Sequence, residues 1–200
     1  MSAKALPPSD LNSFLAGIGH LCLQWALLEQ IVIAIIATAE NIPLEKAYTR
    51  YGGLDMQPRL NMAIKLTDEA KWPKHLTKPL RSIRKAVQGG IGEGRNIFVH
   101  GVHEALPEKG EFALTMIRLS PPKRRQIVSI LDVADLISRI RELVNEAERV
   151  FRGYGVWQFG PDHKDDCREQ IAQTKAMARF IRAQNIKRAL KLLLANLKPW

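Results

Sequence analysis

The chain has 200 residues, of which 46% are hydrophobic and 25% charged, enough for one globular domain with a short extension. These proportions exclude collagen-like, low-complexity and wholly disordered chains. Thirty Lys and Arg against twenty Asp and Glu give a net charge of +10, which favours nucleic acid over anionic membrane or acidic protein as the partner. The two cysteines, Cys22 and Cys167, are too few for a disulfide framework and fit a reducing cytoplasm.

The chain opens with a long apolar helix, predicted to start at Asp10 or Ser13 and to continue to about Asn41. Its segment 18–37 is long enough to cross a bilayer, but polar residues interrupt the middle. These residues are His20, Gln24, Glu29 and Gln30. Because a carboxylate at mid-bilayer costs about 2.5–3.5 kcal/mol, we expect the central helix of a soluble bundle and no membrane partner.

Two shorter helices are expected next. Pro43 starts one that runs through Tyr48 and stops at the glycines 52–53. Pro58 opens another that ends before Pro73. The residues that its spacing turns inward are Leu60, Ile64 and Leu66.

A glycine-rich break follows the next predicted helix, which covers residues 75–88. Four of the six residues 89–94 are glycine, and each glycine costs about 1 kcal/mol inside a helix. We therefore expect a break or hinge at this point. Residues 95–100 can resume the helix, and Gly101 can end it.

The region after residue 101 predicts a hairpin and then an amphipathic helix. Residues 102–106 and 112–119 are the expected strands, and the prolines 121–122 open the helix. The glycine-containing segment 153–155 is expected to end it. The expected inward stripe consists of Ile127, Ile130, Leu131, Ala134, Ile137, Ile140, Val144, Ala147 and Phe151.

The last part of the chain is strongly basic, because residues 170–200 contain seven Lys or Arg and no acid. The sequence as a whole predicts an all-α bundle with one small β-hairpin. We assign a helical domain to residues 1–157 and a basic helical C-terminal extension to residues 158–200.

Several familiar sites are not supported. The glycine-rich segment 89–94 lacks the Lys-Ser/Thr pair of a phosphate-binding loop and follows a predicted helix rather than a strand. His163 and Cys167 stand four residues apart, but no second ligand pair accompanies them. We therefore expect no metal and no other cofactor.

The strongest candidate site is the hexapeptide Arg95-Asn96-Ile97-Phe98-Val99-His100. At 100° per residue, Asn96 and His100 share one helix face, and the long side chain of Arg95 can swing toward it. A guanidinium, an amide and an imidazole gathered on one turn can bind a phosphate and move a proton near neutral pH. The same residues also fit a surface arginine with a histidine capping a helix end.

This hexapeptide resembles the Arg-x(4–6)-His signature of the HEPN superfamily, in which a polar residue, often Asn, follows the Arg. A long first helix with Trp25 and Glu29 one turn apart, the hairpin and the long later helix resemble that family too, over Leu11 to Phe151. The resemblance implies an all-α bundle that forms a homodimer. Many members are metal-independent endoribonucleases, whereas others bind nucleotide or act as scaffolds.

We therefore expect an RNA endonuclease that uses the 2′-hydroxyl of its substrate as nucleophile and leaves a 2′,3′-cyclic phosphate. His100 would transfer protons, Arg95 would stabilise the phosphorane, and Asn96 would position a phosphate oxygen. Glu29 could pair with Arg95 across the bundle and fix its orientation, or it could face a polar seam. The candidate RNA-binding residues are Arg81, Arg84 and Lys85, together with Lys187, Arg188 and Lys191 in the basic extension.

The alternative class is a non-catalytic HEPN-like dimer that binds nucleotide, RNA or a protein partner. The basic extension could likewise lie on anionic lipid or dock on a partner instead of gripping RNA. A role as a toxin or defence effector, with an antitoxin or regulatory protein as a further partner, rests on fold-level analogy.

Overall fold

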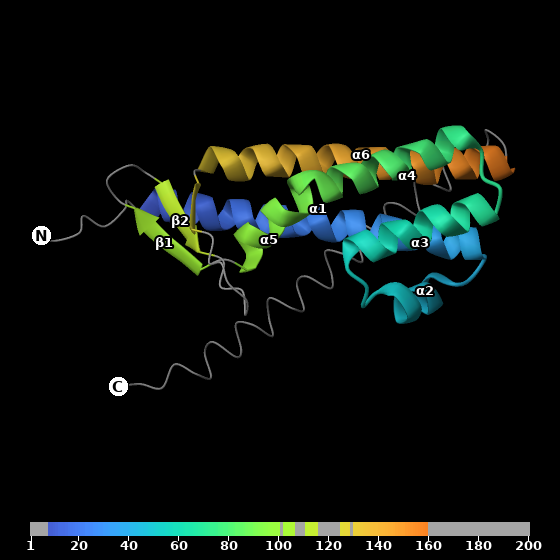
Figure 1. Ribbon diagram of the computed structural model, residues 1–200, viewed down its shortest axis with the longest axis horizontal. Helices are drawn as coiled ribbons and strands as arrows, with labels where there is room; N and C mark the ends of the chain where they lie inside the picture. Colours follow the sequence, from blue (N-terminus) through green and yellow to red (C-terminus); the bar gives the residue numbers. More distant parts are fainter. Residues whose placement is uncertain (1–7, 101, 107–110, 116–124, 129, 160–200) are drawn as a thin grey trace, which may run out of the picture.

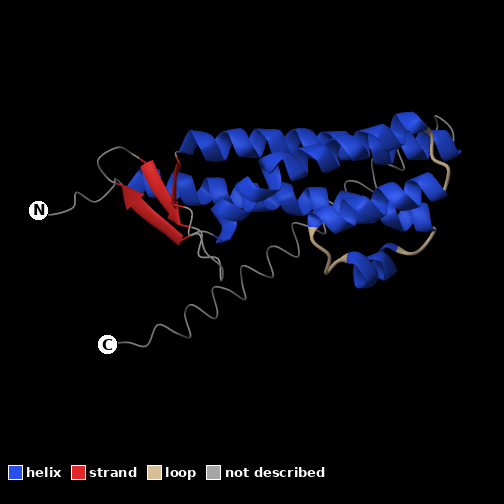
Figure 2. Cartoon of the chain, viewed as in Figure 1, coloured by secondary structure: helices blue, strands red, loops and turns tan. Residues whose placement is uncertain are grey.

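The structure, a computed structural model, describes residues 8–100, 102–106, 111–115, 125–128 and 130–159 (Figure 1). Helices dominate this part of the chain, in agreement with the all-α prediction (Figure 2). They are α1 (Pro8–Glu40), α2 (Leu44–Tyr51), α3 (Met56–Glu69), α4 (Lys74–Ala86), α5 (Gly92–His100) and α6 (Ile130–Phe159). The predicted extension lies outside the described residues from position 160 onward.

Helix α1 is the central helix of the bundle. Every residue from Ile31 to Ala37 is buried, and α6, α3 and α2 all pack against this helix. Among the described residues, one helix segment, Asn12–Glu40, has the length and composition of a membrane span, and 61% of its most apolar window is buried inside the protein. Its neighbours in the bundle account for that apolar composition.

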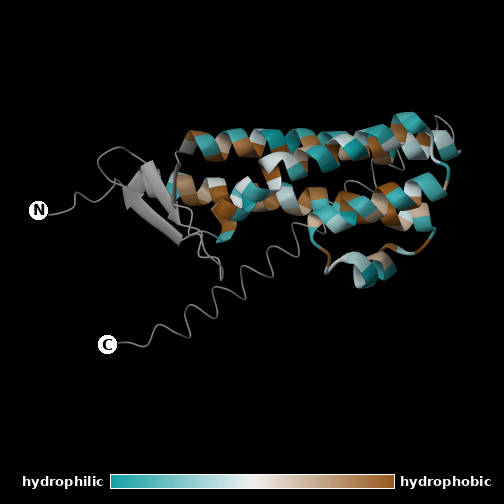
Figure 3. Cartoon of the chain, viewed as in Figure 1, coloured by the Kyte–Doolittle hydropathy of each residue, from teal (hydrophilic) through white to brown (hydrophobic). Residues whose placement is uncertain are grey.

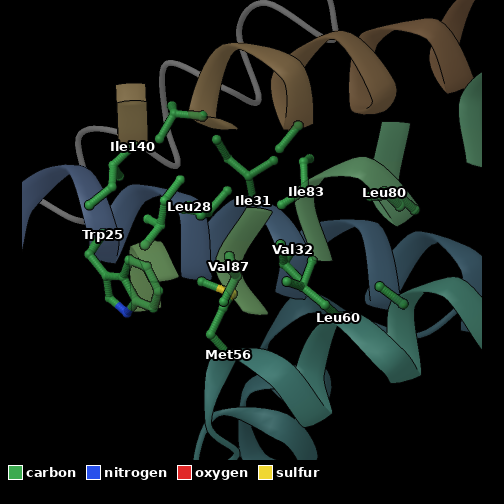
Figure 4. Packing of buried hydrophobic residues seen from close by; sticks show 14 of the residues in the cluster. Trp25, Leu28, Ile31, Val32, Met56, Leu60, Leu80, Ile83, Val87 and Ile140 are labelled. Atoms are coloured by element: carbon green, nitrogen blue, oxygen red, sulfur yellow. The ribbon is translucent and has the colours of Figure 1, made fainter. Parts of the chain in front are cut away.

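The core lies between α1, α3, α4 and α6, which run side by side along the molecule (Figure 1). Around α6, apolar and hydrophilic positions alternate with a helical period (Figure 3). Each helix therefore contributes one apolar stripe to a shared core. The residues at its centre include Leu28, Val32, Leu60, Leu80, Ile83 and Ile140 (Figure 4).

The shorter helices follow the predicted boundaries closely. Helix α2 continues to Tyr51 and is followed by Gly52, and α3 begins two residues before Pro58, which sits in its first turn. The three predicted inward residues of α3 do contact the core: Leu60 and Ile64 are buried, and Leu66 is half-buried.

The predicted glycine break lies between α4 and α5, in the segment η1 (Val87–Ile91). Gly89 (φ −78°, ψ 20°) and Gly90 (φ 117°, ψ −18°) leave the helical conformation there. The backbone of Gly90 is in a region that residues with a side chain rarely adopt. The kink therefore sets the direction in which α5 leaves the bundle.

Three short antiparallel strands follow α5: β1 (Val102–Leu106), β2 (Glu111–Thr115) and β3 (Arg125–Val128), in the order β1-β2-β3. The prediction of a helix from residues 121–122 is wrong, because α6 begins only at Ile130. Ile127 pairs with Ala113 of β2 rather than joining the helix stripe. Ile127 and Val128 are β-branched, and the free edge of β2 offers a strand partner.

The face of α6 also differs from the prediction at its start. Leu131 is 78% exposed and Ala134 is exposed, so neither belongs to the inward stripe. Val133 packs against Gly17 of α1 instead, and this contact turns Leu131, 200° away around the helix, toward solvent. The buried apolar side chains of α6 are Val133, Leu136, Ile137, Ile140, Val144, Ala147 and Val150.

The glycines at 153–155 do not end α6, which continues to Phe159. A Cβ atom at Gly153 would lie 2.5 Å from the Cδ2 atom of Leu76. Gly153 therefore allows α4 and α6 to approach closely, and its role is packing rather than helix termination.

Candidate functional site

Helix α5 carries the polar residues of the hexapeptide on its solvent-facing side. Phe98 is buried and lies with its ring centroid 6.5 Å from that of Phe14 on α1, which holds this turn against the core. Asn96 and His100 are exposed, and Arg95 is half-buried. The polar groups of the turn are therefore accessible while its apolar residues anchor the helix.

The three polar side chains meet at one nitrogen atom of Arg95. Nη1 of Arg95 donates a hydrogen bond to Oδ1 of Asn96 (2.9 Å) and lies 3.2 Å from Nε2 of His100. Because a guanidinium only donates, a hydrogen bond at this contact requires the tautomer in which Nε2 of His100 is the acceptor and Nδ1 carries the proton. The arrangement joins a fixed cation to a proton acceptor at the protein surface.

The indole ring of Trp25 on α1 packs against the guanidinium of Arg95. The Cζ atom of Arg95 lies 5.5 Å from the centroid of the Trp25 ring, within the range of a cation–π interaction. Trp25 is only 5% exposed, and its indole nitrogen lies at the margin of the apolar cluster (Figure 4). Sequence reasoning did not assign this role, although the position of Trp25 one turn before Glu29 was the available signal.

Glu29 has Arg59, not Arg95, as its ionic partner in the described part of the chain. One oxygen of Glu29, Oε1, accepts a hydrogen bond from Nε1 of Trp25 (3.0 Å) and lies 3.4 Å from Nη1 of Arg59. Glu29 therefore acts on Arg95 through the orientation of the Trp25 ring. The expected pairing of Glu29 with Arg95 is not present among the described residues.

Arg59 is buried at 3% exposure and ties α3 to the preceding turn. It donates hydrogen bonds to three backbone carbonyls, those of Tyr51, Gly52 and Leu54. Burial raises the pKa of nearby Tyr48, an effect that the Arg59 guanidinium opposes and the Glu29 carboxylate reinforces.

The predicted RNA-binding cations upstream of the site differ in their surroundings. Nη2 of Arg81 forms an ion pair with Oδ2 of Asp68 at 2.5 Å, and Nη1 of Arg84 donates to Oδ1 of Asn61 at 3.3 Å. Lys85 is exposed. The remaining predicted cations lie outside the described residues: Lys187, Arg188 and Lys191.

The described residues contain no group of three or more His, Cys, Asp or Glu that could hold a metal ion. His163 and Cys167 lie outside the described residues. What the described site offers is a guanidinium, an amide and an imidazole, a set suited to binding a phosphate and transferring a proton.

Comparison with models of protein families, with curated proteins and with solved structures gives no match.

Proposed function

We propose that the protein is a metal-independent endoribonuclease of the HEPN type. The observation that carries this proposal is the meeting of Asn96 Oδ1 and His100 Nε2 at Nη1 of Arg95, on an accessible helix face. An imidazole beside a guanidinium supplies both a proton-transfer group and a cation for a phosphate. The net charge of +10 favours a polyanionic substrate.

The reaction is an attack of the RNA 2′-hydroxyl on the adjacent phosphorus atom. His100 accepts the proton of the hydroxyl as the O2′–P bond forms. Arg95 stabilises the charge of the phosphorane, and Asn96 orients one of its oxygens. The P–O5′ bond then breaks and the leaving O5′ oxygen takes up one proton, which leaves a 2′,3′-cyclic phosphate on one product and a 5′-hydroxyl on the other.

A homodimer completes this mechanism. A single histidine does not easily serve as base on one side of an in-line displacement and as acid on the other. A two-fold dimer would bring a second His100 and a second Arg95 to the same site. One His100, in its protonated form, would then give its proton to the leaving O5′ oxygen, while the other, in its neutral form, acts as base.

The test is cleavage of a mixture of RNAs by the purified protein in excess EDTA. The wild-type protein should cleave, and His100→Ala should not. His75→Ala, which removes another exposed histidine, is the matched control and should cleave normally. Activity that disappears on chelation and returns with Zn²⁺ or Mg²⁺ would contradict the mechanism.

A second outcome distinguishes the alternative class. If the wild-type protein binds RNA or nucleotide but leaves RNA intact, the site is a binding clamp and the protein is a non-catalytic module. The same assay therefore separates the two functions.

A further inference from the structure

The contact between Arg95 and His100 leaves the imidazole without a free acceptor. Nη1 of Arg95 lies 3.2 Å from Nε2 of His100, and a hydrogen bond between them uses the lone pair of Nε2. In the tautomer that this bond requires, the second ring nitrogen, Nδ1, carries the proton and can only donate. While the contact is made, neither nitrogen of His100 can take a proton from a substrate.

Nη1 of Arg95 is also fully engaged. A terminal guanidinium nitrogen carries two hydrogens, and Nη1 has two described partners, Oδ1 of Asn96 at 2.9 Å and Nε2 of His100. The other terminal nitrogen, Nη2, forms no hydrogen bond with a described residue. An arriving anion therefore meets a free Nη2 and an Nη1 whose hydrogens are both in use.

The third nitrogen of the guanidinium is closed to a ligand. Nε of Arg95 is buried and has no hydrogen-bond partner in the described part of the chain, and the ring of Trp25 lies against the group, 5.5 Å from Cζ. A phosphate that accepts two parallel hydrogen bonds from a guanidinium uses either Nε with Nη2 or Nη1 with Nη2. Because Nε is enclosed, the pair Nη1 and Nη2 is the one left for a phosphate.

A phosphate bound to Nη1 and Nη2 has to displace one of the two partners of Nη1. The contact of His100 is the longer one, at 3.2 Å against 2.9 Å for Asn96. His100 is also the exposed last residue of α5, so its ring can turn away without disturbing the core. Asn96 stands directly beside Arg95 within the helix. His100 is therefore the partner that gives way.

We propose that Arg95 holds His100 inactive in the free protein and that the phosphate of RNA releases it. The phosphate takes one hydrogen of Nη1 and one of Nη2, and His100 turns away from Arg95. One nitrogen of His100 is then a free proton acceptor beside the bound phosphate, while Arg95 stays against Trp25. This inference deepens the proposed function and rests on it, because it states how the substrate regulates that same site.

The first test is the affinity for a phosphate that the proposed reaction cannot cleave. The probe is a 2′-O-methylated dinucleotide, which has one phosphodiester and lacks the nucleophile. His100→Ala should bind this probe roughly two- to tenfold more tightly than the wild type in isothermal titration calorimetry, because no hydrogen bond to His100 has to be broken. A histidine that bound the phosphate directly would give the opposite result, weaker binding in the variant.

Two variants and one ligand serve as controls. His75→Ala removes an exposed histidine of α4 and should bind the dinucleotide like the wild type. Arg95→Ala removes the phosphate contact and should lose most of the binding. The methylated nucleoside, which has no phosphate, should bind no more tightly to His100→Ala than to the wild type.

The second test follows the ring nitrogens of His100 by ¹⁵N NMR at about pH 8, where an ordinary histidine is neutral. In the free protein Nδ1 should carry the proton, a form that an unconstrained imidazole populates less. The dinucleotide should shift His100 toward the tautomer mixture of His75, whose own signals should stay unchanged. Arg95→Ala should show that mixture at His100 without any ligand.

The inference is overturned if His100→Ala binds the dinucleotide no more tightly than the wild type does. It is also overturned if the dinucleotide leaves the tautomer of His100 unchanged, which would mean that Asn96 is the partner displaced. A wild-type protein that does not bind the dinucleotide would overturn it as well.

Release and cleavage fail separately in this design. If both tests give the expected results but the wild-type protein leaves unmodified RNA intact, the release of His100 by phosphate stands and the proposed catalytic function falls. If the protein cleaves RNA in EDTA while His100→Ala gains no affinity for the dinucleotide, the proposed function stands and this inference falls.

Discussion

The orientation of Arg95 depends on residues far from it in the sequence. Its guanidinium lies over Trp25, Trp25 donates to Glu29, and Glu29 faces the buried Arg59. Each contact restricts the orientation of the next side chain. The accessible guanidinium of Arg95 is therefore linked through Trp25 and Glu29 to the buried Arg59. A guanidinium held in this way would need less reorganisation to bind the phosphate of the proposed substrate.

Substitutions at the candidate site should change the rate of RNA cleavage without lowering the stability of the fold. We expect Arg95→Ala and His100→Ala each to lower the rate of RNA cleavage by about 100-fold or more, because they remove a charge and a proton carrier. Asn96→Ala should lower it by about tenfold. All three variants should keep their thermal midpoint within a few degrees, since none of these side chains fills the core.

Initial rates and thermal unfolding measured on the same preparations check this prediction. A large loss of stability in Arg95→Ala or His100→Ala, with the rate per folded molecule unchanged, would show that the pair is structural.

Arg59 should matter for stability instead. Arg59→Met removes the donor for three backbone carbonyls and leaves Glu29 without its ionic partner. We expect the free energy of unfolding to fall by about 3 kcal/mol, as measured by urea denaturation. Arg50→Met, which breaks a more exposed ion pair with Glu40, is the control and should cost no more than about 1 kcal/mol. Equal losses in the two variants would contradict this role of Arg59.

At the scale of elements, the kink between α4 and α5 is decided by one of two adjacent glycines. Gly90 has a φ of 117°, whereas Gly89 has a φ of −78°, and an added Cβ atom would meet nothing within 4 Å at either position. Gly90→Ala should therefore destabilise the protein by about 1–2 kcal/mol, and Gly89→Ala should be close to neutral.

Thermal or urea unfolding of the two variants side by side measures this difference. Since the kink directs α5, Gly90→Ala should also reduce RNA cleavage more than Gly89→Ala does. Two variants of equal stability and equal activity would show that the kink is not set by the backbone of Gly90.

Local patterns predicted the helices well where one short-range signal dominated. The prolines and glycines around α2, α3 and the kink determine their own backbone, so their positions could be read directly. The start of α6 and the role of Gly153 could not be predicted in this way. They depend on contacts with β2 and with Leu76 of α4, and sequence spacing does not reveal which elements become neighbours.

The same limit applies to the candidate site. Helical spacing alone brought Arg95, Asn96 and His100 together, because they lie within six residues. The partners of Trp25 and Glu29 depend on how α1, α3 and α5 pack, so the choice of Arg59 over Arg95 as the partner of Glu29 required the structure.

In the whole molecule, different helices form the core and carry the candidate site. The apolar length of α1 is buried among its neighbours, and this provides a stable base for one short helix, α5, that directs polar groups outward. The excess positive charge, concentrated on α4 in the described part of the chain, then lies on the helix that leads to the site. A polyanion drawn to this surface would approach Arg95 and His100.

The proposed activity is cleavage of RNA by Arg95 and His100 through the 2′-hydroxyl of the substrate. The most direct measurement is mass spectrometry of the ends of RNA products formed in EDTA by the wild-type protein and by His100→Ala. The proposed mechanism predicts 2′,3′-cyclic phosphate and 5′-hydroxyl ends from the wild type and no such products from the variant. Ends with a 5′-phosphate, or the same cyclic products from His100→Ala, would contradict it.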